Sequence, residues 1–157
     1  MRRLLVLRPE PGASATVERA RERGLEAVAV PLFEIEPVEW QLPDSAGFDG
    51  LLLTSANALR FAGSAIEALR GLPVYAVGDA TAATARQAGF GIASIGDAGV
   101  DRLLDSIEPD LKLLHLCGED RRTPEEARQA ITAITAYRAL AREDADLGAV
   151  LGAVALI

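Results

Sequence analysis

The sequence predicts an α/β fold built from two doubly wound parallel-sheet domains, because short apolar segments alternate with helical segments along most of its 157 residues. Segments 3–7 and 25–30 flank a helical segment at 14–23, which is a βαβ beginning. From residue 50 the same alternation resumes and repeats. Between the two regions lies an extended stretch, 31–40, with two prolines and no helical period. We therefore expect a connecting strand between two units.

The first region begins with an apolar strand followed by a short helix. Ser14 is placed to cap the helix at 14–23, and Gly24 suits its C-terminal end, because glycine tolerates the left-handed conformation found there. Residues 25–30 then alternate with period two, and Pro31 ends the strand. This region therefore predicts a strand, a helix and a second strand.

The second region favours a parallel sheet with helices on both faces. Its strands are expected at 50–53, 74–77, near Ile92, 112–116 and 131–137, and its helices at 56–69, 80–88, 100–107 and 124–130. Several strands end in small polar residues, such as Thr54-Ser55 and Gly118-Glu119. Ligands of open α/β sheets bind beyond the carboxyl ends of strands, so these residues are candidates for a site.

The final segment, 152–157, predicts a buried parallel strand with no helix after it. A strand of this kind needs a crossover connection and neighbouring strands. We therefore expect the first domain to be discontinuous and incomplete here, formed by residues 1–36 and 139–157. The second domain, 38–137, is expected to be complete and inserted into the first.

The composition argues against several classes of function. The net charge of −7 and the isoelectric point near 4.8 argue against nucleic acid as a partner, because proteins that bind it carry basic patches. Cys117 and His115 are the only cysteine and histidine, so neither an intrachain disulfide nor a structural zinc site is expected. No apolar run reaches the roughly 20 residues of a membrane span, and the N-terminus lacks the apolar core of a signal peptide. We expect a cytoplasmic protein with no membrane partner.

Two of the strand ends carry groups that suit anion binding or helix capping. Ser55 can cap the helix that follows it, and its loop also offers hydroxyl and backbone N–H groups to an anion; the two roles are compatible. Asp79 would repel an anion and is expected to cap the next helix. A nucleotide is not expected, because Gly-x-Gly-x-x-Gly and Walker motifs are absent.

The remaining chemistry-bearing residues have mostly structural explanations. His115 lies in an apolar run, which favours a core role, and Cys117 has no histidine at a spacing typical of a dyad, so it is expected to pack. Glu125 and Glu126 would lie in the first turn of a helix, where the macrodipole explains them. Tyr137, expected at the end of the last strand of the region, either packs or donates a proton from its phenol.

Six short motifs follow one another along the chain. They are Arg8-Pro9-Glu10-Pro11-Gly12, Pro31-Leu32 with Ile35-Glu36-Pro37, Leu53-Thr54-Ser55-Ala56-Asn57-Ala58, Val77-Gly78-Asp79-Ala80-Thr81-Ala82, Leu116-Cys117-Gly118 and Tyr137-Arg138. In order and spacing, the chain resembles the uroporphyrinogen-III synthase family over nearly its whole length. The resemblance implies two α/β domains joined by a two-stranded linker.

The resemblance also implies an activity. Members of the family are lyases of tetrapyrrole and heme biosynthesis that cyclise the linear tetrapyrrole hydroxymethylbilane to uroporphyrinogen III, with loss of water and inversion of ring D. They use no metal or organic cofactor. The positions that match the family's carboxylate-binding loops are Thr54, Ser55, Ala56, Thr81 and Ala82. Arg8 is expected to be a further carboxylate partner, and Tyr137 matches the tyrosine that assists departure of the hydroxyl group.

Other interpretations are compatible with the same pattern. One is a non-catalytic α/β module that binds a tetrapyrrole or another polycarboxylate. A flavodoxin-like or receiver-like domain is a weaker alternative, since Lys112 lies at the start of a strand, whereas a receiver carries its lysine at a strand end. A monomer is expected, with self-association through the incomplete first domain as the alternative.

Overall fold

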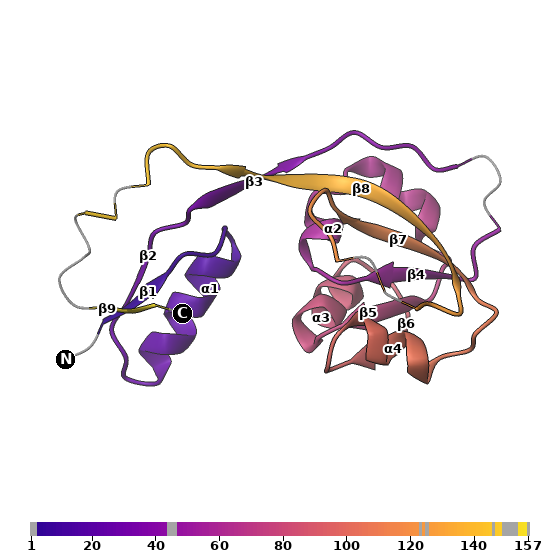
Figure 1. Ribbon diagram of the computed structural model, residues 1–157, viewed down its shortest axis with the longest axis horizontal. Helices are drawn as coiled ribbons and strands as arrows, with labels where there is room; N and C mark the ends of the chain where they lie inside the picture. The colour runs from indigo at the N-terminus through magenta and orange to yellow at the C-terminus, as the bar shows by residue number, and fades with distance from the viewer. Residues whose placement is uncertain are drawn as a thin grey trace. The chain divides into compact units, whose positions relative to one another are not determined.

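The computed structural model describes residues 3–43, 47–122, 124, 126–145, 147–148 and 154–156. The chain divides into two compact units: unit 1 comprises residues 1–36 and 139–157, and unit 2 comprises residues 37–138. Parallel strands and helices form both units, so the predicted α/β class is confirmed (Figure 1). None of the described helices is long and apolar enough to cross a membrane.

Unit 1 is a small parallel sheet with a helix packed on it. Its strand order is β2-β1-β9, with β1 at Arg3–Val6, β2 at Ala27–Ala29 and β9 at Val154–Leu156. Helix α1, Gly12–Glu22, buries Ala13, Val17 and Ala20, whose spacing places them on one helix face. This face packs against the sheet and forms the core of the unit.

The start of α1 differs from the prediction. The helix begins at Gly12 rather than after Ser14, so Ser14 is not its N-cap. Instead, the Glu10 carboxylate accepts hydrogen bonds from the Ser14 N–H at 3.0 Å and the Ser14 hydroxyl at 2.8 Å. A carboxylate outside the helix therefore satisfies a donor of its first turn. Gly24 follows the C-terminal end with φ +74°, as expected.

Unit 2 contains most of a six-stranded sheet with the order β3-β8-β7-β4-β5-β6. The strands are β3 (Phe33–Pro37), β4 (Gly50–Leu53), β5 (Val74–Val77), β6 (Ile92–Gly96), β7 (Lys112–Gly118) and β8 (Ala130–Ala141). The helices are α2 (Asn57–Arg60), the 3₁₀ helix η1 (Ser64–Leu69), α3 (Asp79–Gln87) and α4 (Val100–Ser106). All pairs among β4 to β8 are parallel.

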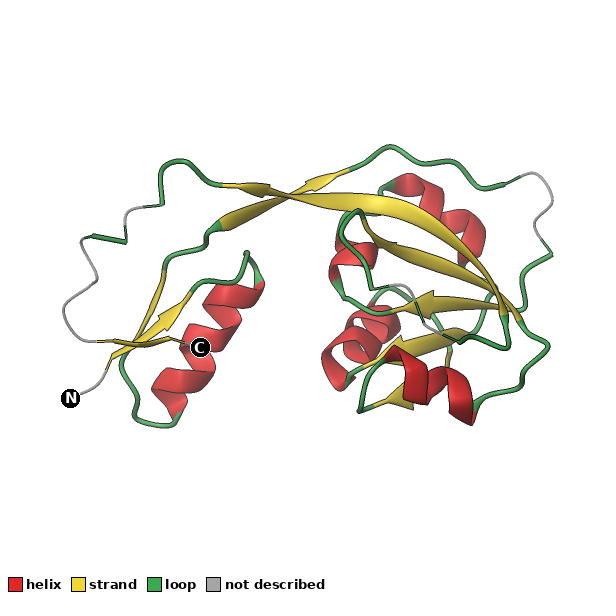
Figure 2. Ribbon diagram, viewed as in Figure 1, coloured by secondary structure: helices red, strands yellow, loops and turns green. Residues whose placement is uncertain are grey.

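The central strands of unit 2 are buried on both faces, which explains their continuous apolar sequence. On one face, Leu51 and Leu114 pack with residues of α2, η1 and α3. On the other face, Leu52 and Leu113 pack with residues of α4. Figure 2 shows the helices arranged around this sheet. The two faces therefore have separate apolar cores.

Two predicted helices of unit 2 are wrong. The helix expected at 56–69 is split into α2, which ends at Arg60, and η1, whose N-cap is Gly63 with φ +67°. No helix forms among the described residues of 124–130. Glu126 therefore does not lie in a first helical turn, and Glu125 lies outside the described residues.

Buried Gln129 accounts for the absence of the second of these helices. Its Nε2 donates to the carbonyl oxygens of Leu104 and Glu108, both at 2.9 Å, at and beyond the end of α4. These bonds tie the segment before β8 to α4 and satisfy carbonyls that a helix end leaves unpaired. Tertiary contacts of this kind override a helix propensity that is weak on its own.

The chain passes between the units on a pair of antiparallel segments. The Val38 N–H donates to the Ala136 carbonyl, and the Arg142 N–H donates to the Leu32 carbonyl, both at 2.8 Å. From one hydrogen bond to the other, the residue number increases in one segment and decreases in its partner, which is the pattern of antiparallel pairing. Strand β8 therefore lies parallel to β7 in its first part and beside β3 in its last.

Replacing Gln129 with leucine should lower the free energy of unfolding by about 1–3 kcal/mol, since the carbonyls of Leu104 and Glu108 lose their donor. Urea denaturation followed by circular dichroism measures the change. Arg128→Gln is the matched control, because Arg128 donates to the Asp105 carbonyl from an exposed position. Its effect should stay within about 0.5 kcal/mol. Equal losses in the two variants would contradict this role of Gln129.

Candidate functional site

The carboxyl ends of the parallel strands of unit 2 lie at one edge of the sheet, as parallel pairing requires. Thr54 and Ser55 follow β4, Gly78 and Asp79 follow β5, and Gly118 ends β7. In open α/β sheets this edge is where ligands bind. The polar groups at these strand ends are therefore the candidates for a binding site.

Thr54 is held by a buried histidine. His115 pairs in register with Leu52, so Thr54 projects from the same face two residues further along. The Thr54 Oγ1 lies 3.2 Å from His115 Nε2. Burial, and then the positive charge of Arg121, lower the pKa of His115 to about 4. The imidazole is therefore neutral near pH 7, and its role is that of a hydrogen-bonded core residue, as predicted.

Ser55 is not the predicted N-cap of α2, because that position is Ala56. Its Oγ nevertheless accepts a hydrogen bond from the N–H of Asn57, the first residue of α2, at 3.2 Å. This bond satisfies a donor of the first turn and leaves the hydroxyl proton available as a donor. Thr54 and Ser55 are both partly exposed. Among the described residues, no backbone carbonyl accepts from the N–H of Ala56.

The start of α3 corrects two expectations. Gly78, with φ +84°, is the N-cap, so Asp79 is the first helical residue rather than the cap. The Ala82 N–H donates to the Gly78 carbonyl at 3.1 Å and is not available to a ligand. The donors left at this helix end are the N–H groups of Asp79, Ala80 and Thr81. Thr81 itself is buried.

Tyr137 lies inside β8 rather than at the end of a strand, because β8 continues to Ala141. Residues of β7 and β8 pair one to one as far as Cys117 and Thr135, and the next pair is Gly118 with Tyr137. Ala136 is therefore an extra residue in β8, a β-bulge. The bulge places Tyr137 on the same sheet face as Gly118.

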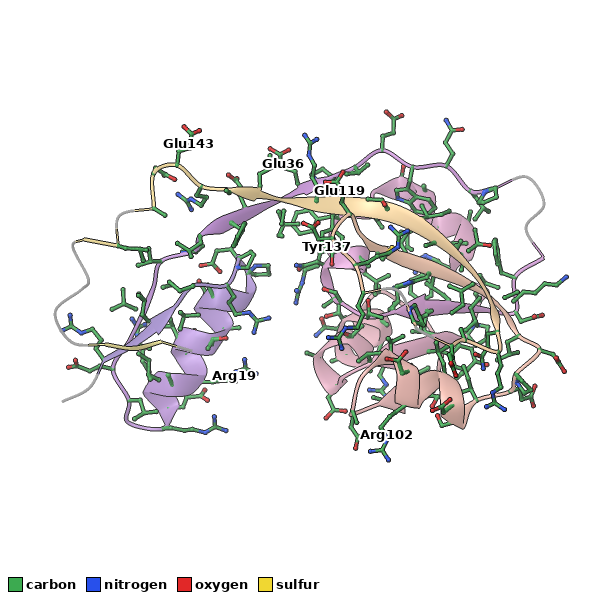
Figure 3. All side chains as sticks on the ribbon, in the orientation of Figure 1. Arg19, Glu36, Arg102, Glu119, Tyr137 and Glu143 are labelled. Carbon is green, nitrogen blue, oxygen red and sulfur yellow. The ribbon has the colours of Figure 1, made fainter. Side chains whose placement is uncertain are left out.

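Gly118 makes room for the tyrosine ring. A Cβ at this position would lie 2.8 Å from Cε2 and Cζ of Tyr137 and 3.0 Å from its hydroxyl oxygen. The Tyr137 carbonyl accepts from the Glu119 N–H at 2.9 Å, and Figure 3 labels both residues. The ring also contacts Phe61, with the ring centroids 6.4 Å apart. The phenol is thus packed on two sides yet partly exposed.

Cys117 has the structural role predicted for it. The side chain is buried, and its Sγ donates to the Ile134 carbonyl at 3.4 Å. Burial raises the pKa of the thiol, which opposes formation of a nucleophilic thiolate. Within the described part of the chain, no three His, Cys, Asp or Glu side chains come together as metal ligands.

In unit 1, Arg8 follows the carboxyl end of β1 and is exposed. Its Nη1 lies 3.5 Å from the Thr16 hydroxyl oxygen, which is at the limit of a hydrogen bond. The guanidinium lies over Gly12, where a Cβ would be 2.8 Å from Arg8 Nε. Arg8 is therefore oriented by the first turns of α1.

Comparison with known proteins places the chain in a family. The model described as "Uroporphyrinogen-III synthase HemD" matches residues 14–151. The chain belongs to the uroporphyrinogen-III synthase family. A uroporphyrinogen-III synthase of Chlorobaculum parvum is 31% identical over 119 residues, which are 69% of this chain and 48% of the relative. The chain thus spans about half the length of that relative.

Solved structures of the uroporphyrinogen-III synthase family share the fold. The enzyme from Helicobacter pylori matches with a TM-score of 0.57 at 18% identity, over 91% of this chain and 64% of its own. A mutant enzyme from Thermus thermophilus matches with a TM-score of 0.59 at 20% identity, over 90% of this chain and 64% of its own. At these identities the likeness concerns the fold alone.

Part of the site of this family member could not be anticipated from the motifs. They indicated Thr54, Ser55 and Tyr137, but not the hydrogen bond between His115 and Thr54 or the packing of Gly118 under Tyr137. A glycine at the end of a buried strand was the available signal for the second contact. The bulge left no signal in the apolar pattern.

Replacing Gly118 with alanine should displace the Tyr137 ring and lower the free energy of unfolding by about 1–3 kcal/mol, because the added methyl group overlaps the ring. Two-dimensional NMR of the tyrosine ring protons, together with urea denaturation, measures both effects. Gly71→Ala is the control, since a Cβ there meets no atom within 4 Å. An unmoved Tyr137 ring in Gly118→Ala would contradict the packing described.

The lowered pKa of His115 predicts a pH-dependent stability. The unfolded chain takes up a proton on this residue near pH 6.5 and the folded chain only near pH 4. The free energy of unfolding should therefore decrease as the pH falls between these values, by about 3 kcal/mol from this residue.

The variant His115→Gln isolates this contribution, because glutamine does not titrate. Urea denaturation from pH 7 to pH 4 should show a smaller loss of stability in the variant than in the wild type. Since the carboxylates titrate in both proteins, the difference reports on His115. Parallel stability profiles would show that His115 does not resist protonation in the folded chain.

Proposed function

We propose that this chain performs the uroporphyrinogen-III synthase reaction, cyclising hydroxymethylbilane to uroporphyrinogen III with loss of water and inversion of ring D. The observation that carries the proposal is the Tyr137 phenol, held over Gly118 by the bulge in β8 in a member of this family. The proposal makes the chain a lyase of tetrapyrrole and heme biosynthesis.

Binding of the substrate would rest on fixed dipoles and hydroxyl groups. The linear tetrapyrrole carries eight carboxylates, whereas the chain has a net charge of −7. Backbone N–H groups and hydroxyls can hold an anion without a positive net charge. In unit 2 these groups are the Thr54 and Ser55 hydroxyls, the Ala56 N–H and the free N–H groups of α3, which belong to Asp79, Ala80 and Thr81. Arg8 would serve a carboxylate in unit 1.

Tyr137 would act as the general acid of the first step. Phenols are protonated at neutral pH, so this residue can donate a proton as the carbon–oxygen bond of the hydroxymethyl group breaks and water leaves. The pyrrole left behind is an electrophile that the substituted carbon of ring D attacks. The bond from this carbon to its original bridge would then break, the freed bridge carbon would bond to the unsubstituted carbon of ring D, and the proton lost there would balance the one that the phenol donated. Because the bilane closes unaided to the type I isomer, the protein must also select the conformer that places ring D correctly.

Tyr137→Phe should lower the rate of type III formation by about 10²-fold, at the low end of a general-acid contribution. The assay incubates the chain with enzymatically made hydroxymethylbilane and separates the type I and type III isomers by chromatography. Tyr75→Phe is the control, because it makes the same change at the other tyrosine, which packs near α4. Its rate should match that of the wild type.

The isomer ratio also separates the enzyme from a binding module. Formation of type III product above the uncatalysed background supports the proposed reaction. Only type I product at the spontaneous rate, combined with measurable binding of the bilane, would leave the chain as a non-catalytic module and refute the proposal.

A further inference from the structure

We propose that Arg8, Thr16 and Arg19 form a carboxylate-binding subsite on unit 1, in which Arg19 is a binding residue that the sequence motifs did not indicate. The inference deepens the proposed function and rests on it for the identity of the natural ligand. The chemistry of the subsite itself, two guanidinium groups directed at one point, is independent of that ligand.

Two arginines converge on one hydroxyl group. Thr16 Oγ1 donates to the Gly12 carbonyl at 2.8 Å. The same oxygen accepts from Arg8 Nη1 at 3.5 Å and from Arg19 Nη2 at 3.4 Å. A hydroxyl offers one donor and two acceptor sites, so Thr16 uses all of its capacity. The two guanidinium nitrogens consequently lie within about 7 Å of each other.

This arrangement does not serve the stability of unit 1. Two positive groups so close repel each other. The Arg8 guanidinium lies over Gly12, at the positive end of the α1 macrodipole, and the first turn of α1 contains no acidic residue, whereas Arg19 belongs to the last turn and reaches back from it. Among the described residues, no carboxylate forms an ion pair with Arg8 or Arg19. Glu10, the acidic residue nearest to Arg8 in the sequence, is engaged by Ser14.

The surroundings favour this position of both side chains. A Cβ at residue 12 would lie 2.8 Å from Arg8 Nε and 3.0 Å from Cζ, so the absence of a side chain there lets the guanidinium rest on the helix. Side chains of a helix tilt toward its N-terminus, which lets Arg19 reach back to Thr16 one turn earlier. Figure 3 labels Arg19 on α1.

The ligand class follows from the donors. Guanidinium groups present N–H pairs that match a carboxylate, and both side chains are exposed to solvent. The subsite lies by the carboxyl end of β1, where parallel sheets bind ligands. One carboxylate held by both arginines would remove their repulsion. A polycarboxylate is therefore the expected ligand.

The first experiment measures binding of uroporphyrin III, an octacarboxylate, to the full chain by fluorescence titration. Arg8→Gln and Arg19→Gln should each raise the dissociation constant about tenfold. The double variant should weaken binding by clearly less than the product of the two effects, because both residues hold the same carboxylate. Arg23→Gln, which removes an equal charge at the C-cap of α1, should bind as the wild type does.

A second measurement separates ligand binding from a structural role. Without ligand, the thermal unfolding midpoint of Arg19→Gln should equal or exceed that of the wild type, because repulsion is relieved. A lower midpoint together with unchanged affinity would overturn the subsite. So would an Arg19→Gln variant that binds uroporphyrin as tightly as Arg23→Gln.

Citrate distinguishes failure of the subsite from failure of the proposed function. This small tricarboxylate should raise the unfolding midpoint of the wild type and of Arg23→Gln, but less that of Arg8→Gln or Arg19→Gln. If citrate behaves in this way while the wild type forms no type III isomer, the subsite stands and the proposed reaction fails. If citrate stabilises all four proteins equally, the subsite is refuted whatever the isomer assay gives.

Discussion

One extra residue in β8 determines how the candidate site of unit 2 is arranged. In unbroken register Gly118 would face Ala136, and the next residue, Tyr137, would project from the sheet face of Cys117. The bulge shifts the pairing by one, so that Tyr137 faces Gly118 and its ring reaches Phe61 on the α2 side. Bulges often reorient a side chain beside a functional site in this way. Gly118 carries no side chain at the place where the ring needs space.

Strand β8, which carries Tyr137, also carries the chain from unit 2 back to unit 1. β8 is buried at Ala136 beside β7, and its last part pairs with β3. Tyr137 therefore belongs to the element that carries the chain back toward unit 1. Its position is fixed by the paired backbone of two strands rather than by a loop, which is what a general acid requires.

The sequence was sufficient to predict those strands whose structure is determined by burial alone. The apolar segments 50–53 and 112–116 predicted β4 and β7 because strands covered on both faces need no polar residues. The sequence was insufficient to predict structure that depends on contacts of a single side chain with residues distant in the chain. Gln129 donates hydrogen bonds to carbonyls more than 20 positions earlier in the chain, and no local sequence pattern predicts these bonds. Because these contacts cannot be recognised locally, the Thr-Pro-Glu-Glu sequence at 123–126 predicted a helix. Likewise, no feature of residues 8–19 indicates that two arginines share one hydroxyl.

Donors at the carboxyl ends of the strands are central to the proposed function, because they are expected to hold a polycarboxylate. The most direct measurement is an amide NMR titration of the isotope-labelled chain with uroporphyrin III. We predict shifts at residues 54–56, 79–81 and 118–119 in unit 2, and at Thr16 and Arg19 in unit 1. Shifts confined to the cavity of about 590 Å³ lined by Asp97, Arg102 and Ser106 would contradict this expectation.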